Sequence, residues 1–339
     1  MPERDDAHHL KALARGVQEG KTRAIARAIT LIESASPHRD QLLQLLEDCD
    51  RNTGTGVYPR VIGITGPPGA GKSTLISDLI PTARALGEKV AVLAVDPSSP
   101  FSGGALLGDR LRMDRHGNDS DVYIRSMASR GRTGGLSPAA LETVTVLTAA
   151  GFDTILVESV GVGQSEVGIL TLADTVLVVL NPGAGDEIQA LKAGVMEIGD
   201  IYVVNKADYP EADGLVRTLQ TAITESSRIV PRPLVLKTVA TKGEGVEALY
   251  RSIGERLDEL AATGGLEERR RRRIAGALQE IAGDVLNEWV KDWLAAAGWS
   301  DPRGGVPFGT LRRQLSSALE TLIPGGGCVD GEDSRSDPV

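Results

Sequence analysis

The sequence predicts an α/β fold, in which a mainly parallel β-sheet carries helices on both faces and helical extensions lie at both ends of the chain. One observation is a series of short, nearly continuous apolar segments, because strands buried on both faces show no polar alternation. The other is that segments with helical periodicity separate most of them, as in parallel sheets. The predicted strands are RVIGITG (60–66), KVAVLAVD (89–96), DVYIRSMA (121–128), DTILVES (153–159), DTVLVVLN (174–181), DIYVVNK (200–206) and RPLVLKTVA (232–240), with helices between them at 137–151, 186–199 and 243–260.

Further helices flank this predicted core. Before it, apolar residues recur at helical spacing from about residue 7 to residue 50, with a break at SASPHRD. After it, a long helix places apolar side chains near one face, which requires a partner surface; these are Ile274, Leu278, Ile281, Val285, Trp289 and Trp293. The predicted division is an N-terminal helical arm at 1–54, a core domain at 55–262, a C-terminal helical region at 263–324 and a disordered tail at 325–339.

Two features of the C-terminal region receive structural interpretations. We predict that Arg269–Arg273 form a solvated helix face beside Glu267 and Glu268, rather than a contact with phosphate or an acidic partner, because charge runs usually face water. Trp289 and Trp293 are expected in the core or a subunit interface rather than at a cofactor.

Composition and charge exclude several classes of partner. The net charge of −9 argues against nucleic-acid and anionic-membrane binding, which require a basic surplus. No apolar stretch approaches the ~20 residues that span a bilayer, and MPERDDAHHL lacks the apolar core of a signal peptide, so we expect no membrane association and a cytoplasmic location. Cys49 and Cys328 are too few for a disulfide framework or a cysteine-rich metal site.

The segment GPPGAGKS fits the phosphate-binding pattern GxxxxGK[ST] and lies between a predicted strand and a predicted helix, the context that a P-loop requires. Its glycines let backbone N–H groups surround phosphate oxygens, and the helix N-terminus adds a positive dipole end. We expect Lys72 to reach the β- and γ-phosphates, Ser73 to ligate Mg²⁺ and Thr74 to contact the α-phosphate. The predicted nucleotide-binding residues of this loop are Gly66, Pro67, Pro68, Gly69, Ala70, Gly71, Lys72, Ser73 and Thr74.

A second motif indicates which base is bound. Asn205, Lys206 and Asp208 form N-K-x-D at the end of a predicted strand, about 130 residues after the P-loop. A carboxylate there accepts hydrogen bonds from guanine N1–H and N2–H₂, whereas adenine presents an acceptor at N1 and is rejected. GTP is therefore favoured over ATP. The backbone of the later TVATKGEG loop is expected to help, at Val239, Ala240 and Thr241.

Three acidic residues are candidates for the metal and the attacking water. Glu158 ends a predicted strand at the carboxyl edge of the sheet, where such folds bind their ligand, and Gly161 allows backbone approach to the γ-phosphate. Glu158 can hold Mg²⁺ directly or through water. Asp96 ends the strand at 89–96 and Asp109 lies beyond it, and either is suited to ligate Mg²⁺ or to position water. Gln164 has the wrong spacing for the usual catalytic glutamine.

Together these segments resemble the MeaB/ArgK-like P-loop GTPases, a G3E/SIMIBI-like family that serves cobalamin-dependent acyl-CoA mutases. The resemblance covers most of the chain. It implies GTP hydrolysis with Mg²⁺, a homodimer formed through the C-terminal helices, and gating of adenosylcobalamin delivery to methylmalonyl-CoA mutase or a relative, with no cobalamin bound directly. The sequence leaves open whether a cobalamin adenosyltransferase joins. The segments that carry the resemblance are GITGPPGAGKST, AVDPSSPFSGGALLGDRLRM, SRGRTGGLS, VESVGVGQSEV, NPGAGDEIQALKAG and VVNKAD.

The resemblance also implies residue roles. Asn181–Gly194 corresponds to a switch segment, in which Lys192 is the candidate coupling residue. Ser159 and Val239 depart from the family, which commonly has threonine and serine there. The implied catalytic residues are Lys72, Asp96, Asp109 and Glu158; the metal ligands are Ser73, Asp96, Asp109 and Glu158; and the switch or coupling residues are Gln164, Asp186, Glu187 and Lys192.

Two other functional classes are alternatives to this one. A GTP-dependent metallochaperone shares the P-loop, but it needs Cys and His ligands, and the four histidines here are scattered. The second alternative is a protein kinase, but the sequence identifies no phosphoacceptor site.

Overall fold

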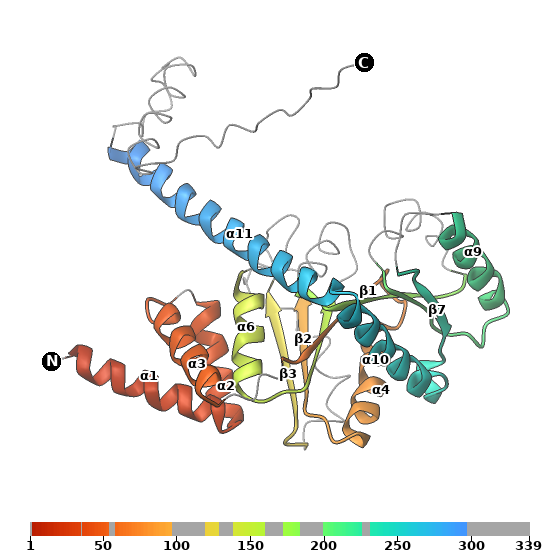
Figure 1. Cartoon of the computed structure of the whole chain (residues 1–339), viewed down its shortest axis with the longest axis horizontal. Helices are drawn as coiled ribbons and strands as arrows, with labels where there is room; N and C mark the ends of the chain where they lie inside the picture. The colour runs from red at the N-terminus through yellow and green to blue at the C-terminus, as the bar shows by residue number, and fades with distance from the viewer. Residues whose placement is uncertain are drawn as a thin grey trace, which may run out of the picture. The chain divides into compact units, whose positions relative to one another are not determined.

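The computed structural model describes residues 2–34, 36–53, 58–96, 119–128, 138–159, 172–183, 199–225 and 231–296 (Figure 1). The chain divides into two compact units, residues 1–281 and residues 282–339. None of the described helices is long and apolar enough to cross a membrane.

Within the described residues, the predicted sheet is confirmed as seven strands, every pair of which is parallel. Their order is β3-β2-β4-β1-β5-β6-β7, so β1 lies at the centre between β4 and β5. The chain leaves β1 toward one half of the sheet and later returns to build the other half. This reversal creates a crevice at the carboxyl end of β1, where α/β sheets bind ligands. The strands are β1 Arg60–Thr65, β2 Val90–Asp96, β3 Val122–Ala128, β4 Thr154–Ser159, β5 Thr175–Leu180, β6 Ile201–Val204 and β7 Leu234–Lys237.

Alternate residues of the strands face two separate apolar clusters. In β1, Ile62 and Ile64 face the cluster that contains α4 (Lys72–Ala85) and α10 (Val246–Ala262), while Val61 faces the other cluster. Burial on both faces explains why the strands are continuously apolar in sequence. The second cluster contains buried side chains from five helices, which are α1 (Pro2–Gln18), α2 (Thr22–Glu33), α3 (Arg39–Thr53), α6 (Pro138–Ala149) and α9 (Ala212–Glu225).

The three N-terminal helices pack beside α6 (Figure 1). The helix break predicted at SASPHRD is confirmed, because α2 ends at Glu33 and α3 begins at Arg39. Two ion pairs, Arg39 with Glu142 and Arg125 with Glu33, tie these helices to α6 and β3. The apolar side chains of α2 and α3 therefore extend the second cluster outward from the sheet.

One helix of the structure was not predicted from the sequence, and some predicted segments lie outside the described residues. Helix α9 was not proposed, although Leu215, Leu219 and Ile223 recur at helical spacing and are buried against the sheet. The predicted helix at 186–199, apart from Gly199, and the predicted tail at 325–339 lie outside the described residues.

The last described helix, α11 (Gly265–Ala296), overturns the prediction for the arginine run. Three of the five arginines share one side of the helix and bind two carboxylates that immediately precede β5 and β6. Arg269 donates two hydrogen bonds of 2.7 Å to Asp200. Arg270 and Arg273 donate to Asp174, at 3.0 Å and 2.5 Å, and Asp174 is completely buried. We call these five residues the arginine clamp.

The prediction failed because the buried acids are far away in the sequence. Asp174 also accepts a hydrogen bond of 3.0 Å from the backbone N–H of Val61, so it orients the start of β1 as well. The prediction of a solvated face holds for Arg271 and Arg272, which are exposed. Among the described residues, Arg272 forms an ion pair with Glu268 on its own helix, at 2.9 Å.

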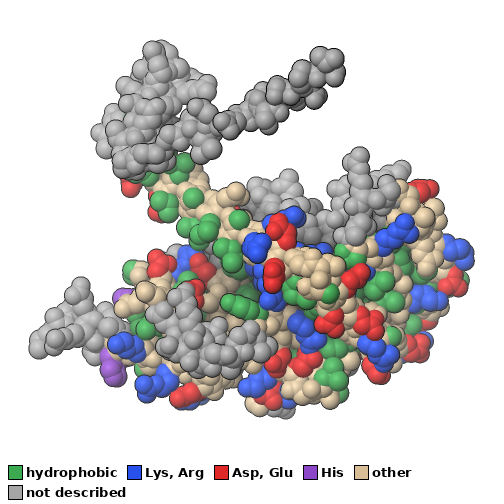
Figure 2. Space-filling view, in the orientation of Figure 1, with side chains coloured by type: hydrophobic (Ala, Val, Ile, Leu, Met, Phe, Trp, Pro, Cys, Tyr) green, Lys and Arg blue, Asp and Glu red, His purple; other side chains and the backbone are tan. Residues whose placement is uncertain are grey.

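Beyond the clamp, α11 presents exposed apolar side chains at Ile274, Leu278 and Ile281. Figure 2 shows hydrophobic side chains along this helix. In the second unit, the rings of Trp289 and Trp293 stack with their centroids 6.5 Å apart.

The clamp predicts a specific loss of stability. We expect Asp174→Asn to lower the free energy of unfolding by about 3 kcal/mol, because it leaves two partly buried guanidinium groups without their carboxylate. Urea unfolding followed by circular dichroism measures this change. Arg271→Ala, which alters an exposed arginine of the same run, is the control and should change stability by no more than about 0.5 kcal/mol. Equal stabilities of the two variants would contradict the clamp.

Candidate nucleotide-binding site

The predicted P-loop follows the central strand β1 and leads directly into α4. Gly66 has φ 137°, and a Cβ atom there would lie 2.0 Å from the carbonyl oxygen of Val179. Gly71 has φ 93°, and its Cβ would lie 2.3 Å from Nδ2 of Asn205. Both positions require glycine, because the loop bends sharply while passing close to β5 and to the N-K-x-D motif.

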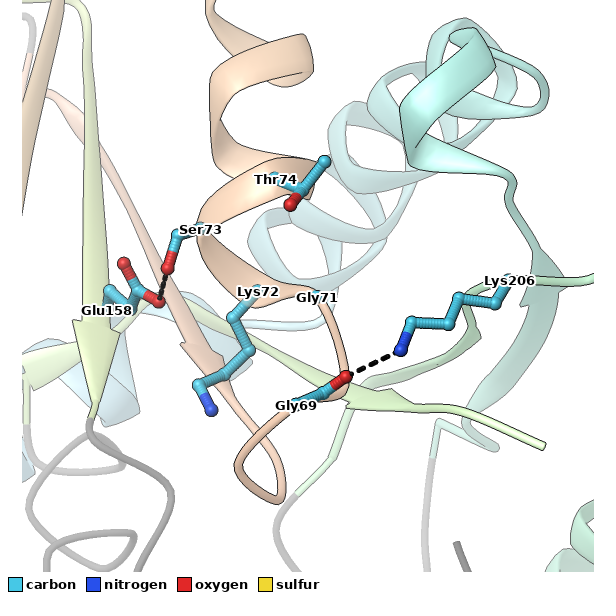
Figure 3. Close-up of a pocket in the computed structure, with 7 residues that line it drawn as sticks. All are labelled: Gly69, Gly71, Lys72, Ser73, Thr74, Glu158 and Lys206. Carbon is cyan, nitrogen blue, oxygen red and sulfur yellow. Dashed lines mark hydrogen bonds between the residues drawn. The ribbon is translucent and has the colours of Figure 1, made fainter. Parts of the chain in front are cut away.

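The side chains at the start of α4 are buried at the base of this loop. The Lys72 ammonium donates to the carbonyl oxygens of Gly66, at 2.8 Å, and Pro67, at 3.2 Å. Its positive charge is therefore held inside the loop, where phosphate oxygens would meet it. Figure 3 shows Lys72, Ser73 and Thr74 on the first turn of the helix, with Ser73 directed toward Glu158.

Glu158 lies beside the P-loop because β4 pairs with β1. In the register of these strands Glu158 is opposite Ile64, one residue before the end of β1. Its Oε1 accepts a hydrogen bond of 2.7 Å from the Ser73 hydroxyl, and both side chains are buried (Figure 3). The next residue, Ser159, donates to the Thr65 hydroxyl at 2.9 Å, which joins the ends of the two strands again.

Ser73 and Glu158 fit a Mg²⁺ ion. Mg²⁺ prefers hard oxygen ligands at about 2.1 Å in octahedral geometry, so neighbouring ligand oxygens lie about 3 Å apart. The separation of 2.7 Å between Ser73 Oγ and Glu158 Oε1 is close to that spacing. Among the described residues no group of three or more His, Cys, Asp or Glu could hold a metal ion.

The N-K-x-D motif contacts the P-loop at the end of β6. The buried Asn205 donates from Nδ2 to the carbonyl oxygen of Ala70 at 2.9 Å. Its Oδ1 accepts from the Thr238 hydroxyl and from the backbone N–H of Ala240, both at 3.1 Å. Lys206 has φ 55°, a rare conformation for a non-glycine residue, and its ammonium donates to Gly69 at 2.9 Å (Figure 3).

The part of the motif that is predicted to contact the base is exposed, unlike the part that contacts the P-loop. Asp208 lies at the surface, and the loop predicted to help it forms the short helix η4 (Ala240–Lys242). The backbone N–H of Val239 donates to the backbone carbonyl oxygen of Glu244 at 3.0 Å. Two of the three backbone positions expected near the base, Val239 and Ala240, therefore use their N–H groups inside the protein.

The structure brings together part of the predicted site. The residues that line one cleft come from the P-loop, the start of α4, the end of β4 and the N-K-x-D motif; they are Gly69, Gly71, Lys72, Ser73, Thr74, Glu158 and Lys206. Asp96 ends β2, which pairs with β4, but its side chain is not among those described. Outside the described residues lie Asp109, Gly161, Gln164, Asp186, Glu187 and Lys192.

Sequence reasoning missed Thr238 and Lys242. Thr238 completes the hydrogen bonds of Asn205, and Lys242 forms an ion pair with Asp208. Neither belongs to a spaced motif, so the only available signal was their place in the TVATKGEG segment beside the expected base loop.

Comparison with known proteins agrees with this geometry. A family model described as "Methylmalonyl Co-A mutase-associated GTPase MeaB" matches residues 25–294. A putative GTPase of Pyrococcus abyssi is 46% identical over 274 residues, covering 80% of this chain and 83% of its own length. A mouse protein named "Methylmalonic aciduria type A homolog, mitochondrial" is 36% identical over 272 residues, covering 75% of this chain and 65% of its own.

A solved structure also matches. The crystal structure of an LAO/AO transport system kinase superposes with a TM-score of 0.68 at 27% identity, covering 92% of this chain and 97% of that chain. The chain belongs to the MeaB family, and it is a P-loop GTPase. The resemblance and fold class predicted from the motifs are confirmed.

The close approach at Gly71 makes the site sensitive to one methyl group. We expect Gly71→Ala to weaken GDP binding by about tenfold or more, because the new Cβ clashes with Asn205 in addition to the strain of positive φ. Equilibrium binding of a fluorescent GDP measures the effect. Gly69→Ala is the control, because its φ of 79° gives similar strain while a Cβ there meets nothing within 4 Å. Losses of equal size would show that backbone strain alone matters.

The pairing of Ser73 with Glu158 predicts a defect that depends on the metal. Glu158→Gln should lower the rate of GTP hydrolysis on the order of 100-fold, because a neutral amide is a poor ligand and leaves the phosphate charge less compensated. Binding of GDP in excess chelator should change little. A variant that loses GDP binding in chelator, or keeps full hydrolysis with Mg²⁺, would exclude this role.

Proposed function

We propose that this GTPase is a chaperone of a cobalamin-dependent acyl-CoA mutase, either methylmalonyl-CoA mutase or a close relative. GTP binding and hydrolysis would gate the delivery of adenosylcobalamin and the release of damaged cofactor. The observation that carries the proposal is the match to the mutase-associated family over residues 25–294. The mouse relative supports it, since its name refers to methylmalonic aciduria.

The proposed reaction is hydrolysis of the γ-phosphate of GTP. Water attacks the γ-phosphorus, the bond to the β–γ bridging oxygen breaks, and GDP and inorganic phosphate leave. Lys72 would bind the phosphates by exchanging the carbonyl oxygens of Gly66 and Pro67 for phosphate oxygens. Ser73 and Glu158 would hold Mg²⁺, which neutralises phosphate charge when it is bound.

The remaining predicted acids complete this proposal. We assign Asp96 and Asp109 to the acidic cluster that binds metal and orients water. The support is the parallel pairing of β2 with β4. Asp96 and Glu158 lie at the carboxyl ends of these neighbouring strands, at the same edge of the sheet. Gly161 is assigned to the γ-phosphate.

We assign guanine recognition to Asp208, with the carboxylate accepting from N1–H and N2–H₂ of the base. Asn205 and Lys206 support this assignment, because their side chains hold the motif against the P-loop at Ala70 and Gly69. We assign the loop backbone at 239–241 to the rim of the base site.

Switch and coupling functions are assigned to Gln164, Asp186, Glu187 and Lys192. The support is their connection to the site along the chain: Gln164 follows β4 after Glu158, and the other three follow β5, which pairs with β1. Changes near the γ-phosphate would thereby reach the surface that meets the mutase.

We also propose a homodimer formed through the C-terminal helical region at 263–324. The exposed Ile274, Leu278 and Ile281 recur every three to four residues on α11, and a continuous apolar face of this kind is stabilised by burial against another helix. A second copy of the chain offers the same face, as a two-fold interface requires.

The test is the steady-state rate of GTP hydrolysis with and without a cobalamin-dependent acyl-CoA mutase from the same organism. We expect the mutase to stimulate hydrolysis by about tenfold or more, because switch GTPases commonly need a partner to complete or order the catalytic set. ATP should give no comparable rate, and Lys72→Ala should remove the stimulated rate.

Two results would count against the proposal. Absence of both stimulation and a complex, with GTP and with GDP, would leave a GTPase that serves another client. Stimulation by a metal-free metalloenzyme instead would favour the metallochaperone alternative.

A further inference from the structure

The loop after β7 directs a lysine at the proposed guanine-reading carboxylate. Lys242 Nζ lies 3.2 Å from Oδ2 of Asp208. We propose that Lys242 is a positioning residue for the guanine site: it fixes the rotamer of Asp208 so that the carboxylate accepts both hydrogen bonds of the base. This inference rests on the proposed role of Asp208.

The loop that carries Lys242 is held in place independently of the ion pair. The short helix η4 ends at Lys242, and an isolated β-bridge joins Val239 to Glu244 across it. The backbone N–H of Val239 donates to the carbonyl oxygen of Glu244 at 3.0 Å, and the backbone N–H of Lys242 donates to the carbonyl oxygen of Val239 at 2.9 Å. The backbone at Lys242 is therefore held by hydrogen bonds within its own loop, separately from the contact between its side chain and Asp208.

The same loop is attached to the other end of the N-K-x-D motif. Asn205 Oδ1 accepts from Ala240 N and from the Thr238 hydroxyl, both at 3.1 Å. The loop thus contacts the motif twice, through buried hydrogen bonds at Asn205 and through the ion pair at Asp208. The side chain of Val239 is apolar and buried, so it supplies no donor to the carboxylate, and Lys242 supplies one.

Exposure limits the size of the effect. The side chains of Lys242 and Asp208 are 53% and 45% exposed, so solvent screens their attraction. What the pair contributes is mainly orientation, because a carboxylate that is already in place loses less rotamer freedom when the base binds. We therefore expect Lys242→Met to raise the Kd for GDP by about two- to fivefold.

The experiment measures the Kd of GDP for the full chain and three variants. Lys242→Met should weaken binding as stated, and Lys242→Arg should retain most of the affinity because it keeps the donor and the charge. The matched control is Lys237→Met, which removes a similar exposed pair, with Asp213 at 3.0 Å and exposures of 51% and 69%. The control should leave the Kd unchanged.

A double-mutant cycle separates positioning from general stabilisation. Asp208→Asn should exchange guanine for xanthine, because an amide can donate to the 2-oxo group. In that background the ion pair no longer exists, so Lys242→Met should leave the Kd of XDP unchanged. The effect in the parent chain should also shrink in 1 M salt, where the screening length falls to about 3 Å.

The outcomes distinguish the two levels of the argument. If Asp208→Asn binds XDP no better than the parent chain does, the proposed role of Asp208 fails. If it gains XDP binding but Lys242→Met leaves the GDP Kd unchanged, or lowers it because the lysine competes with the base, the positioning role is overturned. An equal loss for XDP in the Asp208→Asn background would likewise overturn it.

Discussion

The nucleotide site depends on one buried amide, that of Asn205. Its nitrogen binds the P-loop at Ala70, and its oxygen binds the loop after β7 through Thr238 and Ala240. Three segments that are distant in the sequence are thus fixed relative to one another by a single side chain. Leaving any of these buried groups without a partner costs about 1–3 kcal/mol, so the arrangement is strongly specified. Gly71 is part of the same constraint, because only a residue without a Cβ fits against this amide.

The parallel sheet connects this site to the arginine clamp at the opposite edge. Asp200 precedes β6 and is bound by Arg269, while Asn205 follows β6 directly. The strand between them has only four residues, so the two side chains are separated by about 17 Å of extended backbone. Displacement of the first turns of α11 would therefore act on the strand that carries the base motif. The clamp fixes the helix to the sheet where a short, rigid element leads to the nucleotide.

The sequence was sufficient for features that are local or periodic. All seven strands, the P-loop and the N-K-x-D motif follow from patterns within about ten residues, and their places at one edge follow from parallel pairing. The clamp could not be predicted, because nothing near Arg269 indicates that two acids between 69 and 99 residues before their arginine partners are buried beneath the helix. The contact between Asn205 and Ala70 joins residues separated by 135 positions. Such pairings depend on strand order, which no local pattern contains.

The site divides the binding of a nucleotide into two electrostatic environments. Lys72, Ser73 and Glu158 are buried, so the charges that meet the phosphates act with little screening. Lys242 and Asp208 are about half exposed, and charge interactions there are weak. In the proposed site, affinity would therefore derive mainly from the phosphates, whereas the choice of base would derive from the geometry of two hydrogen bonds. A carboxylate on a solvent-exposed turn would perform that selection best with its orientation fixed, and the loop after β7 contacts the motif at both ends, at Asn205 and at Asp208.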